Sequence, residues 1–528
     1  MWAISTVLLA FCATEAFAFG RAIGRRASIP APEVEHPWTI HNGSFTQLID
    51  HSNPDLGTFQ QFYWYNYYWY KGEGSPIVLW SPTHDNGSDY APFVYNTTTM
   101  GRIAQEVGGA AIVLEHRVSI REGNSSPFEK LTVENLKYLT VENAMQDVVY
   151  FANNVELPFA PNGATAKDAP WILFGGSYAA GITAWVANVH SGTFWAYYAS
   201  SALMQAIDPY WQYFVRIQAG MPKNCSKDVS SVIDYMDDVF LHGSEQNVTN
   251  LKAKFGLEVL QNDDLMATIG RAPGMWQLGD IKDNHLFVTW CDYIENVNIT
   301  HTYTGPEGDG VGVEAALEGY ARWWKEAGYT FFRGFYGCTA DDTDLDCFGS
   351  HDGRSITYTD LSLDGSRQYT WLLCSSPLAW WQTGAPEGIP SLVSRLLTAE
   401  YNDRICGQYF PPGPDGKSSY NPTNRTVDDF NAFTGGWNPQ NLNRVLFVNG
   451  EFDPWTSSGV SSDFRPGGPM QTSENVTVLI TPGGHHVTDG YTANGVGPGT
   501  EKVKATIDAA VAQIVKWVGE WPGRKQEE

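Results

Sequence analysis

Five short apolar runs, each bounded by polar residues, recur along the chain. They occupy residues 76–80, 110–114, 171–174, 444–448 and 476–480. Continuous apolar runs of this length are typical of strands that are buried on both faces of a parallel sheet. Segments with helical periodicity accompany them, at residues 141–155, 183–189 and 503–521. The alternation of strands and helices predicts an α/β domain with a doubly wound sheet.

The middle third of the chain has a different pattern. Between residues 211 and 430, helical stretches and acidic clusters prevail, and the pattern of a buried parallel strand is not evident. We therefore expect a mainly helical insertion at 211–430. It interrupts the α/β domain, whose two parts are then residues 43–210 and 431–528.

Composition excludes several classes of protein. Of the 528 residues, 43% are hydrophobic and 14% aromatic, which excludes disordered, collagen-like and coiled-coil proteins. Acidic side chains outnumber basic ones by 58 to 33, and the net charge is −25. Such a chain lacks the basic surface that nucleic acid requires, and an anionic membrane surface would repel it.

The first residues predict export. Residues 4–18 form an apolar run that is too short and too interrupted for stable membrane insertion, and it ends in Ala16, Phe17 and Ala18. This ending is typical of signal-peptide cleavage, so we expect a signal peptide at residues 1–18 and a linker or propeptide at 19–42. The pair Arg25–Arg26 is either a processing site or two solvated arginines.

Cysteines and glycosylation motifs agree with export. An even number of cysteines follows the signal peptide, and their disulfide pairing stays open: Cys225, Cys291, Cys338, Cys347, Cys374 and Cys406. Asn-x-Ser/Thr motifs predict glycosylation at Asn42, Asn86, Asn96, Asn124, Asn224, Asn247, Asn298, Asn424 and Asn475. We therefore expect a glycoprotein that is secreted or delivered to a vacuole or lysosome.

A candidate nucleophile follows the third predicted strand. Ser177 stands after Gly175 and Gly176 and before a helical pattern. On such a tight turn a serine hydroxyl is presented at the carboxyl end of the sheet, and the N–H of Tyr178 can face a developing oxyanion. The usual motif has a glycine two residues after the serine, where this chain has Ala179.

An acid and a histidine follow the last two predicted strands. Asp453 comes after the strand ending at residue 448, and His485 and His486 come after the strand ending at residue 480. Serine needs a base that takes its proton, and a carboxylate orients that base. The chain order of serine, aspartate and histidine is that of the α/β-hydrolases, so we expect this fold with a helical insertion.

Several motifs around these residues resemble a known family of serine peptidases. It comprises prolyl carboxypeptidase, dipeptidyl peptidase II and the fungal acid proline-specific endoproteases. The resemblance runs from about Phe45 to Trp521 and is carried by residues 115–117, 126–127, 175–178, 194–196, 384–388, 449–455 and 459–468. The last three segments look especially like the fungal endoproteases.

The resemblance implies a serine peptidase that cleaves on the carboxyl side of proline through an acyl-enzyme at Ser177. In the family motif the catalytic histidine stands two residues after a glycine and three before an aspartate. Gly484 and Asp489 both point to His486 by this rule. Trp455 resembles the tryptophan of the family's substrate pocket. The family's helical insertion caps the site, and the resemblance implies no metal and no organic cofactor.

Two departures from the family and several alternatives stay open. The family usually has a Gly-Glu pair at Thr83–His84, whose glutamate holds the substrate's amino terminus in the exopeptidases, and the loop at 118–123 is longer here.

The expected partners are peptide or protein substrates that contain proline, and the chain is either a monomer or a homodimer. The alternatives are a Pro-Xaa carboxypeptidase or dipeptidyl peptidase, an esterase, and a catalytically weak glycoprotein on the same scaffold.

Overall fold

The computed structural model describes residues 36–82, 86–118, 126–279, 281, 284–298, 308–362 and 367–523. The signal peptide, the Arg25–Arg26 pair, Thr83–His84, Asn124 and most of the loop at 118–123 lie outside these residues. Within the described residues, no helix is both long enough and apolar enough to cross a membrane.

The chain divides into two compact units. The helical unit comprises Ile207–Asp360 and Ala379–Thr423, and the sheet unit comprises the described residues up to Ala206, Leu361–Leu378 and the residues from Asn424 onward. The expected insertion at 211–430 therefore differs from the helical unit mainly by Leu361–Leu378. This segment holds α15 (Arg367–Ser375), whose Trp371 indole donates to the carbonyl of Leu139 in the sheet unit.

One eight-stranded sheet forms the centre of the sheet unit, in the order β1-β2-β4-β3-β5-β6-β7-β8. β1 and β2 run antiparallel to their neighbours, and the other strands pair in parallel. The strands are β1 (His41–Leu48), β2 (Thr58–Asn66), β3 (Ile77–Trp80), β4 (Ala110–Leu114), β5 (Trp171–Gly176), β6 (Ala196–Ser200), β7 (Val445–Gly450) and β8 (Val476–Thr481). All five predicted strands are present, but β8 lies at the edge of the sheet and is only partly buried, so the predicted burial on both faces is wrong for this strand. β1, β2 and β6 were not predicted.

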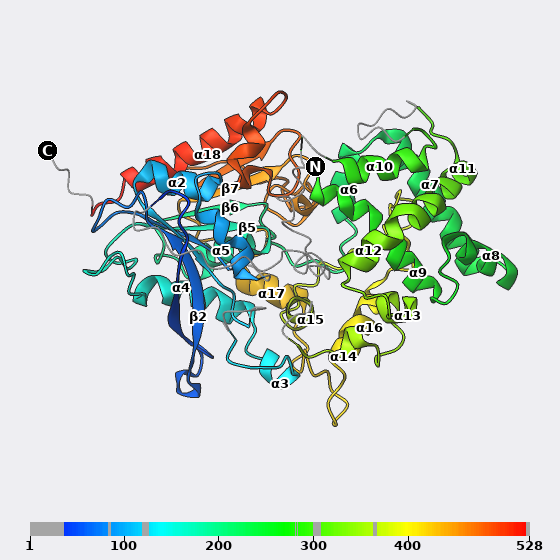
Figure 1. The fold of residues 1–528 in the computed structure, drawn as a ribbon, viewed down its shortest axis with the longest axis horizontal. Helices are drawn as coiled ribbons and strands as arrows, with labels where there is room; N and C mark the ends of the chain where they lie inside the picture. Colours follow the sequence, from blue (N-terminus) through cyan, green and yellow to red (C-terminus); the bar gives the residue numbers. More distant parts are fainter. Residues whose placement is uncertain are drawn as a thin grey trace. The chain divides into compact units, whose positions relative to one another are not determined.

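Helices cover both faces of this sheet (Figure 1). α2 (Thr99–Val107) and α18 (Glu501–Gly519) pack together on one face, and α4 (Val141–Asn154) and α5 (Tyr178–Val189) pack together on the other. The β3, β4 and β5 residues are buried on both faces, which explains their uninterrupted apolar sequence. This strand order with two helical layers is the α/β-hydrolase fold, and the predicted fold class is confirmed. Shorter helices of the unit are α1 (Gly87–Tyr90), α3 (Val133–Leu136) and α17 (Val427–Thr434).

The helical unit contains no strand among its described residues, apart from one isolated bridge between Ile207 and Ala379. Its helices are α6 (Tyr213–Gly220), α7 (Lys223–His242), α8 (Glu245–Phe255), α9 (Asn262–Ile269), α10 (His285–Ile294), α11 (Val313–Trp323), α12 (Tyr329–Phe335), α13 (Asp344–Phe348), α14 (Ile356–Thr359) and α16 (Ala399–Tyr409). The Cys225–Cys291 disulfide joins α7 to α10, and Cys338–Cys347 closes a short loop onto α13. Cys374 lies on α15 and Cys406 on α16.

The glycosylation motifs differ in their exposure. Asn224 is 3% exposed, and its amide donates to Glu295 Oε2 over 3.0 Å, so a glycan has no room there and we withdraw this position. Asn86 and Asn96 are half-buried. The motifs with an exposed asparagine are Asn42, Asn247, Asn298, Asn424 and Asn475.

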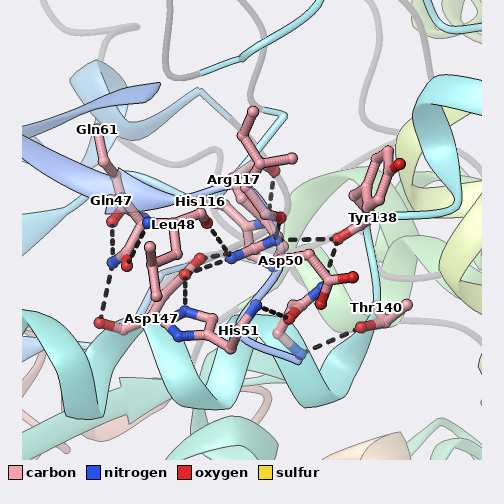
Figure 2. A network of polar contacts seen from close by, with 12 residues as sticks. Gln47, Leu48, Asp50, His51, Gln61, His116, Arg117, Tyr138, Thr140 and Asp147 are labelled. Carbon is pink, nitrogen blue, oxygen red and sulfur yellow. Dashed lines mark hydrogen bonds and ion pairs between the residues drawn. The ribbon is translucent and has the colours of Figure 1, made fainter. Parts of the chain in front are cut away.

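A buried ion pair fixes the end of β4 to α4 (Figure 2). Arg117 donates to both carboxylate oxygens of Asp147, and His51 Nε2 lies 2.8 Å from Asp147 Oδ1. The guanidinium also donates to the backbone carbonyls of Leu48, Ile49 and Tyr138. Burial raises the pKa of Asp147, but the charge of Arg117 and the hydrogen bonds outweigh it, and the pKa lies below its ordinary value. The network therefore joins β1, β4 and α4 through one buried charge pair.

A second buried carboxyl group, in the helical unit, behaves in the opposite way. Glu295 is 1% exposed, and Asp228 beside it accepts from the N–H groups of Val311 and Gly312. Burial and the nearby Asp228 charge raise the pKa of Glu295 to about 7. Since the folded protein binds this proton more tightly than the unfolded chain, Glu295 contributes stability in acid that is lost as the pH rises through 7.

Arg117→Ala should lower the free energy of unfolding by about 3–5 kcal/mol, because it leaves Asp147 buried without its counter-charge. Urea denaturation at constant pH measures this loss. Arg354→Ala is the matched control, since the Arg354–Asp352 pair is exposed, and it should leave the midpoint unchanged. Equal midpoints for the two variants would contradict a stabilising role of the buried pair.

Glu295→Gln should reduce the gain in stability that the wild type shows when the pH falls from 8 to 5. An amide does not titrate, so a pH-dependent contribution on the order of 1–2 kcal/mol should disappear. Melting temperatures at several pH values measure it, with the exposed Glu258→Gln as control. An unchanged pH dependence in Glu295→Gln would refute the assignment.

Candidate active site

Ser177 occupies the sharp turn between β5 and α5. Its backbone angles are φ 60° and ψ −127°, a combination that non-glycine residues adopt rarely. The Ser177 N–H donates to the carbonyl of Ser200 at the end of β6 over 2.9 Å. The side chain is therefore held at the carboxyl end of the sheet, where the sequence analysis expects a nucleophile, and 6% of its surface is exposed.

The turn depends on the glycine before it. A Cβ atom on Gly175 would lie 2.3 Å from the carbonyl oxygen of Ala179, so only glycine lets α5 start this close to β5. Ala179 itself is completely buried, and its small side chain is accommodated where the usual motif has glycine. The departure at this position therefore leaves the turn intact.

Asp453 and His486 form a buried hydrogen-bonded pair. His486 Nδ1 lies 2.9 Å from Asp453 Oδ1, and neither side chain is exposed. Since an ionised carboxylate only accepts, the proton of the neutral imidazole belongs on Nδ1. Nε2 of His486 is then an acceptor, and it makes no hydrogen bond to the described residues. This is the arrangement that a general base requires.

Backbone contacts hold the loops of Asp453 and His486 together. The Phe452 N–H donates to the carbonyl of Gly484 over 2.9 Å. At Gly450 an added Cβ would lie 2.2 Å from the carbonyl oxygen of His485, so glycine is required for this close approach. Asp453 Oδ1 also accepts from the Trp455 N–H over 2.9 Å, which fixes the carboxylate toward His486.

The two histidines are distinguished by their partners. The structure brings His486 Nδ1 into contact with Asp453. The backbone N–H of His485 donates to the hydroxyl of Thr488 over 2.8 Å, and the residue is buried. This geometry favours the histidine that the family motif selects.

The loop of His486 contacts the nucleophile turn directly. The Val487 N–H donates to Ser201 Oγ over 2.9 Å, at the end of β6. A Cβ on Gly176, next to Ser177, would lie 3.3 Å from Val487 Cγ1. The nucleophile turn and the base are therefore neighbours through Gly176 and Val487.

Two further predicted residues lie beside these groups. Tyr178 is the first residue of α5, where backbone N–H groups point out of the helix, and its hydroxyl lies 3.3 Å from His116 Nε2. The indole of Trp455 is completely buried, with its centroid 6.3 Å from that of His486. The Thr83–His84 positions lie outside the described residues.

A buried carboxylate beside the base is the residue whose structural role the sequence analysis missed. Asp489 accepts from the Ser200 hydroxyl over 2.7 Å and from the Tyr198 hydroxyl over 2.8 Å. Burial and the nearby Asp453 charge raise the pKa of Asp489 to about 6, although its hydrogen bonds oppose the shift. In the sequence, Asp489 serves only to choose between the two histidines, because no local pattern reveals its partners on β6.

A group of potential metal ligands lies in the helical unit, at Asp263, Asp264 and His351. Arg404 donates to Asp263, and both the N–H and the hydroxyl of Ser350 donate to Asp264. A guanidinium in this position supplies the positive charge that a metal ion would otherwise supply. We therefore interpret the group as an ion-pair network.

Comparison with known proteins identifies the family. Residues 47–499 match the family described as Serine carboxypeptidase S28. The chain belongs to this family. Its members are serine peptidases, so this chain is a serine-type peptidase by family, and peptides are its substrate class.

Relatives from fungi and animals share most of the chain's length. Serine protease vicPa from Bipolaris victoriae is 37% identical over 90% of this chain and 88% of its own length. A probable extracellular serine carboxypeptidase from Arthroderma benhamiae is 28% identical over 94% and 69%, respectively. The lysosomal Pro-X carboxypeptidase of Mus musculus is 22% identical over 93% and 91%.

Proposed function

We propose that this S28 peptidase hydrolyses peptide bonds on the carboxyl side of proline, with Ser177 as nucleophile, His486 as base and Asp453 as orienting acid. The observation that carries the proposal is the buried Asp453–His486 pair, whose free imidazole nitrogen belongs to the loop that packs against the Ser177 turn. The Asp453–His486 pair and the proximity of Val487 to Gly176 support a serine triad built from distant parts of the sequence.

The proposed reaction has two halves. Nε2 of His486 takes the proton of Ser177 Oγ while Oγ attacks the substrate carbonyl carbon, and Asp453 stabilises the imidazolium that forms. The N–H of Tyr178 donates to the developing oxyanion. His486 then protonates the leaving amine as the C–N bond breaks. His486 then takes a proton from water as the water attacks the acyl carbon, and it returns this proton to Ser177 Oγ as the C–Oγ bond breaks and the carboxylic acid product leaves.

The preference for proline rests on Trp455 and on the relatives. A pyrrolidine ring is rigid and apolar, so an indole surface holds it at a small cost in conformational entropy. The backbone N–H of Trp455 donates to Asp453, and its indole lies beside His486. This position suits a wall of the substrate pocket next to the scissile bond. The mouse relative is named as a Pro-X carboxypeptidase, which agrees with the preference.

An exopeptidase is the second candidate. The fungal relative from Arthroderma benhamiae is named a carboxypeptidase, as is the family. An endopeptidase is favoured by the resemblance of residues 384–388, 449–455 and 459–468 to the fungal endoproteases, and a dipeptidyl peptidase is disfavoured because Thr83–His84 replaces the Gly-Glu pair.

We further propose that the protein is exported as a glycoprotein to the extracellular space or to a vacuole or lysosome. The disulfides Cys225–Cys291 and Cys338–Cys347 suit an oxidising compartment. The exposed asparagines at positions 42, 247, 298, 424 and 475 suit glycosylation. The relatives include proteins named extracellular and lysosomal.

Ser177→Ala and His486→Ala should each lower kcat at least about 1,000-fold, because each removes a group that acts in the transition state. Ser177→Ala should keep the wild-type melting temperature within a few degrees. Hydrolysis of a proline-containing fluorogenic peptide measures the rates, and labelling with a fluorophosphonate reports the nucleophile. His485→Ala is the matched control and should keep most of the activity. The opposite ranking of the two histidine variants would move the base to His485.

A peptide library should be cut after internal proline. Its members carry proline at an internal position, at the penultimate position or at the second position from the amino terminus. Mass spectrometry of the products identifies the bonds. Cleavage confined to the last bond of Pro-Xaa peptides would establish the carboxypeptidase instead. Cleavage without regard to proline would refute the proposed specificity and leave only the serine peptidase.

A further inference from the structure

The Asp489 carboxylate joins the loop of His486 to β6. Asp489 lies in the short turn Thr488–Gly490, three residues after His486, and is 1% exposed. Its Oδ1 accepts from Ser200 Oγ and its Oδ2 from the Tyr198 hydroxyl. Tyr198 and Ser200 are alternate residues of one strand, so both hydroxyls lie on the same face of β6. The carboxylate therefore bridges two donors of a rigid strand.

The same strand end also holds the nucleophile. The Ser200 carbonyl accepts the Ser177 N–H, and the Ser201 hydroxyl accepts the Val487 N–H. Asp489 is thus bonded to the side chain of the residue whose backbone fixes Ser177. The Thr99 hydroxyl of α2 also donates to the backbone carbonyl of Asp489 over 2.5 Å, which holds the loop against a helix.

The segment held in this way is strained. Val487 has φ 52°, a left-handed conformation that is rare for a β-branched residue. Such a conformation persists only where surrounding contacts enforce it. Here the contacts are the Val487–Ser201 bond on one side and the Asp489 carboxylate on the other. Val487 in turn packs toward Gly176 beside the nucleophile.

We propose that Asp489 is a positioning residue, which holds His486 at the distance from Ser177 that proton transfer requires by bonding the base loop to Tyr198 and Ser200. This inference rests on the proposed function of the triad. The charged group that acts on Asp489 is Asp453, from the loop after β7, and the titratable group bonded to it is Tyr198 of β6. Burial keeps the pKa of Tyr198 well above its ordinary value, so its hydroxyl stays a donor.

The test compares substitutions that keep or remove the two hydrogen bonds. In Asp489→Asn the amide oxygen still accepts from one of the two hydroxyls, and the amide N–H donates to the oxygen of the other hydroxyl. Asp489→Leu retains neither bond. We expect kcat to fall about 100-fold in Asp489→Leu, as a shift of about 1 Å at the reacting groups produces, and at most tenfold in Asp489→Asn. KM should stay within about threefold in both, because no substrate contact is removed.

Rates are expressed per active site titrated with a fluorophosphonate, so that loss of folded protein is not counted as loss of rate. Asp264→Leu is the matched control, because Asp264 is also 1% exposed and accepts two hydrogen bonds from Ser350, but in the helical unit. It should lower the melting temperature and leave kcat per titrated site unchanged. The same result in Asp489→Leu would reduce Asp489 to a structural role and overturn the proposal.

If Asp489→Leu does not fold, the kcat values of Asp489→Asn and Tyr198→Phe test the proposal instead. Tyr198→Phe removes one donor and retains the stacking on Phe174, whose ring centroid is 4.3 Å away, and it should lower kcat about fivefold with unchanged KM. Wild-type kcat in both variants would overturn the proposal. A wild type that neither cleaves peptides nor is labelled at Ser177 would refute the proposed function and this inference together. A labelled wild type with unaffected Asp489 variants would refute this inference alone.

Discussion

Parallel pairing of β5, β6, β7 and β8 is the constraint on which the site depends. Its register places Gly176 opposite Ser200, Ser200 opposite Val448, and Gly450 opposite Thr481. Because parallel strands end at the same edge of the sheet, the loops after them begin side by side. Segments separated by almost 300 positions can then form hydrogen bonds through short loops, and no side chain has to reach across the unit.

Buried carboxylates are the second recurring element of the sheet unit. Asp453, Asp489 and Asp147 are all removed from water, and each accepts hydrogen bonds from groups held by neighbouring elements. An unpaired buried charge is costly, so each carboxylate favours an arrangement that supplies it with donors. This cost holds each carboxylate in one position. Such fixed positions matter in an active site, where a displacement of about 1 Å changes the rate.

Protonation of carboxyl groups in both units favours the stability of the folded protein at acidic pH. The chain carries 58 acidic and 33 basic side chains, and burial raises the pKa of Glu295 in the helical unit and of Asp489 in the sheet unit. Protonation removes repulsion in both places without breaking an ion pair. The ion pair of Arg117 and Asp147 sets the opposite limit, because its carboxylate must stay charged. A vacuolar, lysosomal or acidic extracellular setting agrees with this balance.

The sequence by itself determined five of the eight strands, because four of them are apolar and buried on both faces and the edge strand β8 has a similar apolar run, and it determined the chain order of Ser177, Asp453 and His486. It did not reveal β6, whose Ala-Tyr-Tyr-Ala-Ser sequence becomes a strand only between β5 and β7, nor the antiparallel β1 and β2. The burial of Asn224, the pairing of His486 with Asp453 and the Asp489 bridge were decided by tertiary structure. A local pattern encodes which side chains avoid water, whereas a hydrogen bond between distant residues depends on which strand ends become neighbours.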